Sequence, residues 1–126
     1  MKKGRKFNHL GRRREGRKAL LKSLGISLIK HKRIFTTIAK AKALRRFIEP
    51  ILTRAKKDDI SSRRLVFSYL QSNEAIKELF SEIGKNIINR PGGYCRIIRT
   101  GNRLGDNAST CLIELIDYNK DYEKNR

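Results

Sequence analysis

The chain has 126 residues, enough for one domain with a buried core, and its 31 Lys and Arg outnumber 12 Asp and Glu to give a net charge of +19. This excess of positive charge is larger than solubility requires, and the cationic side chains repel one another unless a polyanion neutralises them. No long apolar run is present, so we expect neither a secretory signal nor a membrane-spanning helix.

The N-terminal arm, residues 1–16, is strongly basic and shows neither a helical nor a strand period. Glycines interrupt its Lys and Arg run, which predicts an extended segment that orders only against a polyanion. Residues 1–33 carry 13 Lys and Arg against one Glu, so positive charge is densest here. We expect phosphate contacts from this part of the chain through Lys2, Lys3, Arg5, Lys6, Arg12, Arg13, Arg14, Arg17 and Lys18.

Two helices and a short strand are predicted after the arm. Leucines at helical spacing indicate a helix over residues 17–31, and the β-branched and aromatic residues 33–37 indicate a strand. Thr37 can cap a second helix, residues 38–56. Its apolar stripe continues through Pro50, so we expect the helix to bend there rather than end.

An acidic pair at residues 58–59 predicts a break before two further helices. Ser61 or Ser62 can start a third helix, and Asn73 can cap a fourth, which the Pro-Gly-Gly sequence ends. A run of charge on a helix is often only solvated, but the net charge of +19 favours contact with a polyanion. The expected contacts from the second and third helices are Lys40, Lys42, Arg45, Arg46, Arg63 and Arg64.

Residues 94–100 and 110–116 predict a β-hairpin around a glycine-rich loop. Alternation places one set of side chains on one face (Tyr94, Arg96, Ile98 and Thr100) and the other set on the opposite face (Cys95, Ile97 and Arg99). Arginines spread over both faces and the loop favour several phosphate contacts over a catalytic loop or a cradle for one phosphate. The expected contacts are Arg96, Arg99 and Arg103.

The order of helix, strand, three helices and two strands predicts an α+β fold. We expect about four helices packed on one face of a small three-stranded sheet, with an extended basic N-terminal arm. The expected divisions are a basic arm at 1–16, a single globular domain at 17–118 and a polar tail at 119–126.

No assembled catalytic or metal site is evident. His9 and His31 are not spaced as metal ligands with Cys95 or Cys111, and no P-loop sequence occurs. We therefore expect no enzyme, no catalytic residue, no metal, no cofactor and no small-molecule substrate. The two cysteines are expected to be reduced thiols, with a cross-strand disulfide as the alternative if the hairpin pairs them.

The segment IFTTIAKAKALRRFIEPILTRAK, residues 34–56, resembles the bacterial large-subunit ribosomal protein family seventeen. The matching residues are Ile34, Thr36, Thr37, Lys40, Ala41, Lys42, Glu49, Ile51, Leu52, Thr53 and Lys56. GRKFNHLGR, RPGGYCRIIRTGNRLGDNA and CLIELID resemble the family's arm, hairpin and last strand, so the resemblance covers residues 1 to about 119. One departure is Arg13-Arg14-Glu15-Gly16, where the family usually has Ser or Thr and His, so the usual capping group of the first helix is missing.

The resemblance implies a non-enzymatic structural constituent of the large ribosomal subunit, cytoplasmic and ribosome-bound. It would bind large-subunit rRNA near the outer end of the polypeptide tunnel, beside neighbouring large-subunit ribosomal proteins. The residues alone leave two other classes open: an architectural DNA-binding protein and a small RNA-processing enzyme. Neither a helix-turn-helix nor a zinc finger is evident, which disfavours a sequence-specific reader of DNA.

Overall fold

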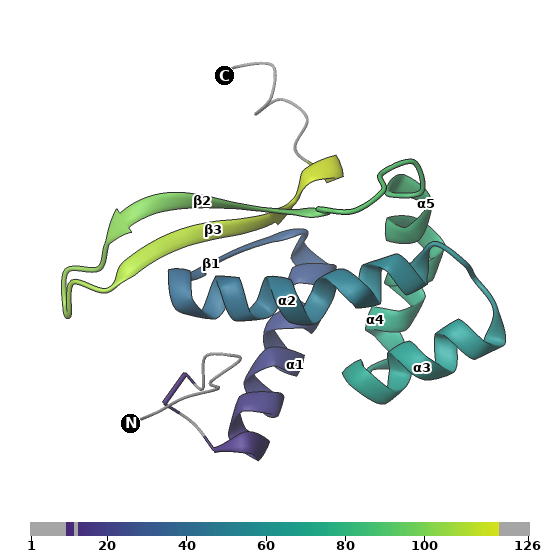
Figure 1. Ribbon diagram of the computed structural model, residues 1–126, viewed down its shortest axis with the longest axis horizontal. Helices are drawn as coiled ribbons and strands as arrows, with labels where there is room; N and C mark the ends of the chain where they lie inside the picture. Colours follow the sequence, from purple (N-terminus) through teal and green to yellow (C-terminus); the bar gives the residue numbers. More distant parts are fainter. Residues whose placement is uncertain (1–9, 12, 119–126) are drawn as a thin grey trace.

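A computed structural model describes residues 10–11 and 13–118 and confirms the α+β architecture. Three antiparallel strands form one sheet in the order β1-β3-β2, where β1 is Arg33–Thr37, β2 is Cys95–Asn102 and β3 is Ser109–Leu115. The hairpin formed by β2 and β3 extends beyond the short edge strand β1 (Figure 1).

The helices lie on one side of this sheet (Figure 1). Helix α2 packs directly against all three strands, α1 contacts α2 and β1, and the remaining helices pack against α1 and α2. Their bounds are α1 (Arg14–His31), α2 (Ile38–Ala55), α3 (Ile60–Leu70), α4 (Asn73–Glu78), the π-helical segment η1 (Leu79–Ile83), α5 (Gly84–Asn86) and the final 3-10 turn η2 (Ile116–Tyr118).

The core lies between α2 and the inner face of the sheet. Strand register places Ile34, Ile113 and Ile97 side by side on that face. The apolar stripe of α2 faces them, with Leu44 and Ile48 fully buried. Apolar residues recur at every second position in the strands and at every third or fourth position in α2, so this part of the fold follows directly from the sequence.

The predicted helix starts are partly confirmed. Thr37 caps α2, its hydroxyl oxygen accepting a hydrogen bond from Lys40 N at 3.4 Å. The third helix instead starts at Ile60, because the Asp59 carboxylate accepts from Ser62 N at 2.7 Å and outcompetes the serines as the cap. The fourth is capped by Ser72 rather than by Asn73, which is already helical.

Helix α1 begins at Arg14, three residues before the predicted start at residue 17. Its N-cap is Arg13, whose side chain makes no capping hydrogen bond, as the missing capping group at this position implied. Helix α2 continues through Pro50 to Ala55, as its apolar stripe predicted.

The hairpin differs from the prediction at its two ends. Tyr94 precedes β2 and does not share the face of Arg96; its ring is buried, and its hydroxyl lies 3.1 Å from the Thr53 hydroxyl on α2. A bulge between Arg99 and Gly101 shifts the register at Thr100, so the predicted alternation stops there.

Both cysteines are buried free thiols rather than a disulfide pair. The register pairs Cys95 with Leu115 and Cys111 with Arg99, four positions apart along the ladder, so the two sulfurs do not face each other. Burial raises the pKa of both thiols; at Cys95 the nearby Glu49 carboxylate adds to this effect. Neither thiol therefore has the lowered pKa of a reactive cysteine.

Candidate nucleic-acid interface

A groove of about 430 Å³ lies between α1 and α2 and collects three of the predicted cationic residues. Arg17 comes from α1, and Lys42 and Arg46 come from α2, one helical turn apart. Leu21, Ala39, Ala43 and Phe47 form the apolar remainder of the lining. Two elements separated by the strand β1 thus bring guanidinium and ammonium groups to one concave surface.

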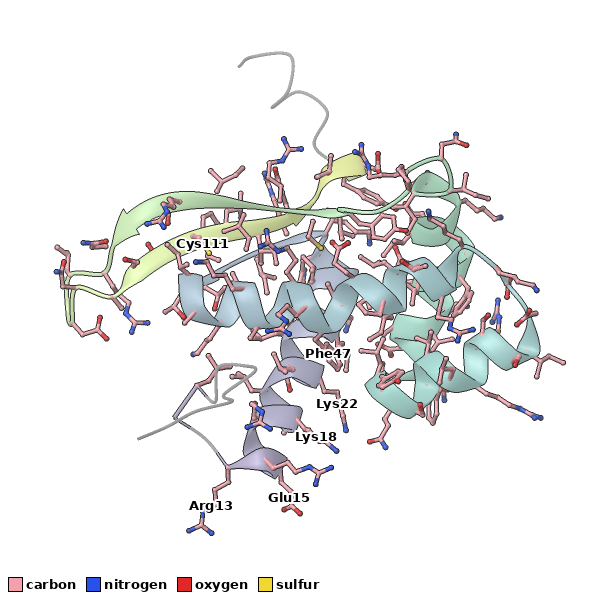
Figure 2. The ribbon with its side chains drawn as sticks, viewed as in Figure 1. Arg13, Glu15, Lys18, Lys22, Phe47 and Cys111 are labelled. Carbon is pink, nitrogen blue, oxygen red and sulfur yellow. The ribbon has the colours of Figure 1, made fainter. Side chains whose placement is uncertain are left out.

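A second groove, of about 380 Å³, continues this surface between α2 and α3. Arg46 lines both grooves, and Phe47 lies between them, with its ring edge-on to that of Tyr69 at 6.5 Å between centroids (Figure 2 shows Phe47). Arg54, also in this lining, was not among the predicted contacts. Spacing would have revealed it, since Lys42, Arg46, Pro50 and Arg54 follow one another at intervals of four along α2.

The N-terminal end of α1 carries further predicted cations. Arg13, Arg14 and Lys18 are exposed there, and Figure 2 shows Arg13 just before α1 and Lys18 on the part of α1 that extends away from the sheet. Lys22, one turn after Lys18, is held by the Gln71 side chain at 2.7 Å. The other predicted arm residues, Lys2, Lys3, Arg5, Lys6 and Arg12, lie outside the described residues.

The remaining predicted cations divide into accessible and internally bound groups. Arg45, Arg64 and Arg99 are exposed, and Lys40 is half-buried at the start of α2. Arg63 is also exposed but is paired with Asp58, with its Nε 2.5 Å from Oδ1 and its Nη2 3.0 Å from Oδ2. Arg96 lies on the outer face of the sheet with its Nε 3.3 Å from Glu114 Oε1, and its side chain is only 13% exposed.

The hairpin tip is organised by its own hydrogen bonds. Both Asp106 carboxylate oxygens accept from the Arg103 guanidinium, at 3.0 and 2.6 Å, and Oδ1 also accepts from Ala108 N at 3.1 Å. Arg103 N donates to Ala108 O, and the Asn102 amide donates to Asn107. The tip therefore presents Arg103 from a defined loop rather than from a flexible one.

This organisation predicts the acid behaviour of Asp106. The Arg103 guanidinium, aided by Ala108 N–H, lowers the pKa of Asp106 from 3.8 to about 2. Since the folded-state pKa is the lower one, the contribution of the carboxylate to loop stability is complete above about pH 4 and is lost as pH falls through about 2. A carboxyl-carbon NMR titration should place the Asp106 midpoint near 2; a midpoint near 3.8 would show that the ion pair does not form in solution.

Three residues of the segment 34–56, which resembles the ribosomal protein family, contact the first residues of the hairpin. The Glu49 carboxylate accepts from Tyr94 N at 3.1 Å and from Cys95 N at 3.0 Å, joining α2 to the first residues of the hairpin. Thr53 contacts the Tyr94 hydroxyl, and the Lys56 ammonium lies 4.9 Å from the centre of the Tyr94 ring. These residues hold the hairpin on α2, a role that their spacing along the sequence did not indicate.

Within residues 10–11 and 13–118, no group of three or more His, Cys, Asp or Glu side chains is arranged to bind a metal ion. Among the helices of the same described part, none is both long and apolar enough to cross a membrane.

The fold and its surface define a small, strongly basic α+β protein whose cationic side chains line open surface grooves. The family model for ribosomal protein L17 matches residues 20–116. The chain belongs to this family, which confirms the resemblance seen in the sequence.

Curated relatives agree along nearly the whole chain. The protein of Bacteroides fragilis named large ribosomal subunit protein bL17 is 58% identical over 126 residues, which is 100% of this chain and 78% of the relative. Proteins of the same name from Porphyromonas gingivalis and Parabacteroides distasonis are 59% and 60% identical, covering 95% and 98% of this chain and 75% and 77% of the relatives.

Proposed function

We propose that this protein is a structural, non-enzymatic constituent of the bacterial large ribosomal subunit and binds large-subunit rRNA. The observation that carries the proposal is the continuous cationic surface along α2. Its two grooves contain Arg17, Lys42, Arg46 and Arg54, and their described linings include no acidic residue. Membership of the ribosomal protein L17 family and the names of its relatives support the subunit assignment.

The proposed contacts come from three parts of the chain. The arm would contribute Lys2, Lys3, Arg5, Lys6 and Arg12 together with the exposed start of α1. The helical grooves would contribute the cations already described, flanked by Lys40, Arg45 and Arg64. Arg96 is only 13% exposed and lies beside Glu114. We therefore propose Arg99 and Arg103 as the principal phosphate contacts of the hairpin, since Arg103, although paired with Asp106, is 53% exposed.

Removing two groove cations should reduce the salt dependence of RNA binding. In the double variant Lys42→Ala/Arg46→Ala, the slope of log affinity against log salt should fall by about 1.4 to 1.8, since each neutralised phosphate contributes about 0.7 to 0.9. Both side chains are exposed, so the fold should persist. Filter binding of large-subunit rRNA between 50 and 300 mM salt would measure the slope.

A charge-matched control separates local contact from general attraction. Lys77→Ala/Lys85→Ala removes the same two charges from exposed positions on α4 and α5, outside the grooves. It should change the slope by less than half as much. Equal changes in the two double variants would show that net charge, and not the α2 surface, determines binding.

The subunit assignment is tested in the cell. An epitope-tagged chain in its bacterial host should sediment with the large subunit through sucrose at high salt, at one copy per particle. Its release to the top of the gradient, or its movement with DNA, would contradict the proposal. An architectural DNA-binding protein would instead bind duplex DNA and rRNA equally well at matched salt.

A further inference from the structure

A third hollow, of about 360 Å³, lies where the end of β1, the start of α2 and the hairpin tip meet. Figure 1 shows the tip bending from the sheet toward the side on which α2 lies. The hollow is separate from the two grooves along α2 and shares no lining residue with them. Its lining consists of Phe35, Thr36, Thr37, Lys40, Arg103 and Thr110.

Phe35 is the aromatic side chain of this hollow, and it is 76% exposed. It lies on the edge strand β1, opposite Leu112, on the face of the sheet turned away from α2. A phenyl ring in this position gains little from folding, because most of its surface remains in water. An exposed ring on a sheet is, however, suited to stacking against a planar group such as an unpaired nucleobase.

The polar side of the hollow matches a phosphate. Lys40 and Arg103 come from α2 and the hairpin tip, and the six lining residues include no carboxylate. Asp106 engages Nε and Nη2 of Arg103, which orients the guanidinium and leaves the Nη1 hydrogens outside that pair. The Thr37 hydroxyl oxygen accepts from Lys40 N, so its own hydrogen remains available to donate.

We propose that this hollow binds one unpaired nucleotide of RNA. The base stacks on Phe35, and a phosphate of the same strand lies between Lys40 and Arg103. The volume is that of a small-ligand pocket, which fits a single nucleotide rather than a duplex. Lys40 and the Nη1 edge of Arg103, in a lining that itself contains no carboxylate, favour a phosphate-bearing strand over a segment of a neighbouring protein. The inference rests on the proposed rRNA binding and assigns part of that binding to a stacked base.

The affinity gained from a stacked base depends little on salt concentration, whereas the affinity gained from charge contacts falls as salt rises. Phe35→Ala should weaken binding of the full chain to large-subunit rRNA by roughly 5- to 150-fold, the range for one stacked base. Because no charge is removed, the slope against salt should stay that of the parent chain. Phe35→Tyr keeps a stacking ring and should bind within about threefold of the parent. The control is Ile60→Ala, which shortens an exposed apolar side chain away from the hollow, on α3, and should bind normally.

The outcomes distinguish this inference from the proposed function. If Phe35→Ala binds rRNA normally while Lys42→Ala/Arg46→Ala shows the reduced salt slope, the hollow holds no stacked base, although rRNA binding stands. If the parent chain itself shows no preference for rRNA, the result contradicts the proposed function and not only this inference. If Phe35→Ala binds naked rRNA normally but detaches more readily from assembled subunits, a neighbouring protein covers Phe35 and the nucleotide assignment is overturned. Ultraviolet cross-linking of rRNA to peptide 33–40 would support it.

Discussion

Replacing Gly84 with Ala is expected to destabilise the fold by about 1–3 kcal/mol, the usual cost of overpacking a core. A Cβ atom at this position would lie 2.3 Å from the carbonyl oxygen of Ala55 and 3.1 Å from its carbonyl carbon. Both are backbone atoms near the end of α2, so no side chain can rotate to make room. The helical run from α4 to α5 must therefore move away from α2. Urea unfolding followed by circular dichroism measures the change.

Gly92→Ala provides the matched control for this variant. It makes the same substitution at an exposed position where nothing lies within 4 Å of the added Cβ. Its free energy of unfolding should remain within about 0.5 kcal/mol of the parent value. If Gly84→Ala were as stable as Gly92→Ala, the two helices would not approach each other as closely as described.

The layers of the fold could be predicted because apolar spacing is a local property of the chain. The stripe through Leu44, Ile48 and Leu52 fixes the buried face of α2 whatever it packs against. Strand 33–37 was likewise recognisable from its β-branched and aromatic residues, and the structure confirms its bounds.

Features that depend on distant partners could not be predicted in the same way. Gly84 reads as an ordinary helix-weakening residue until Ala55 is known to lie beside it. The π-helical turn at Leu79–Ile83 leaves no mark in the spacing of apolar residues. Capping at residues 58–62 depends on which of several short polar side chains reaches a free N–H group, and composition does not decide that competition.

The candidate interface shows the same division. Counting Lys and Arg located the basic segments, but ion pairing within the protein is a property of the fold. Arg96 and Arg63 looked as available as Arg99 in the sequence, yet Glu114 and Asp58 hold them. Phe35, in contrast, was read only as a strand residue, because its exposure depends on the position of β1 at the edge of the sheet.

Replacing Glu49 with Gln is expected to destabilise the protein by about 2–3 kcal/mol and to loosen the base of the hairpin. The carboxylate accepts hydrogen bonds from two successive backbone N–H groups, those of Tyr94 and Cys95, in a partly buried site. A Gln side chain has the same shape but only one acceptor oxygen, so its amide hydrogens would face one of the two donors. Hydrogen bonds to charged groups are the stronger ones, and a buried donor left unsatisfied adds its own cost.

Glu74→Gln is the control for this experiment because it removes the same charge from an exposed ion pair, in which Glu74 lies 3.4 Å from Lys30. Surface pairs of this kind contribute about 0–1 kcal/mol, so its unfolding midpoint should hardly change. Hydrogen exchange should separate the variants further: amides of β2 should lose protection in Glu49→Gln and keep it in Glu74→Gln. Equal midpoints and equal β2 protection would mean that Glu49 does not hold the hairpin on α2. The presence of Glu49 in the segment 34–56, which resembles the family, would then need an explanation other than a contact within this chain.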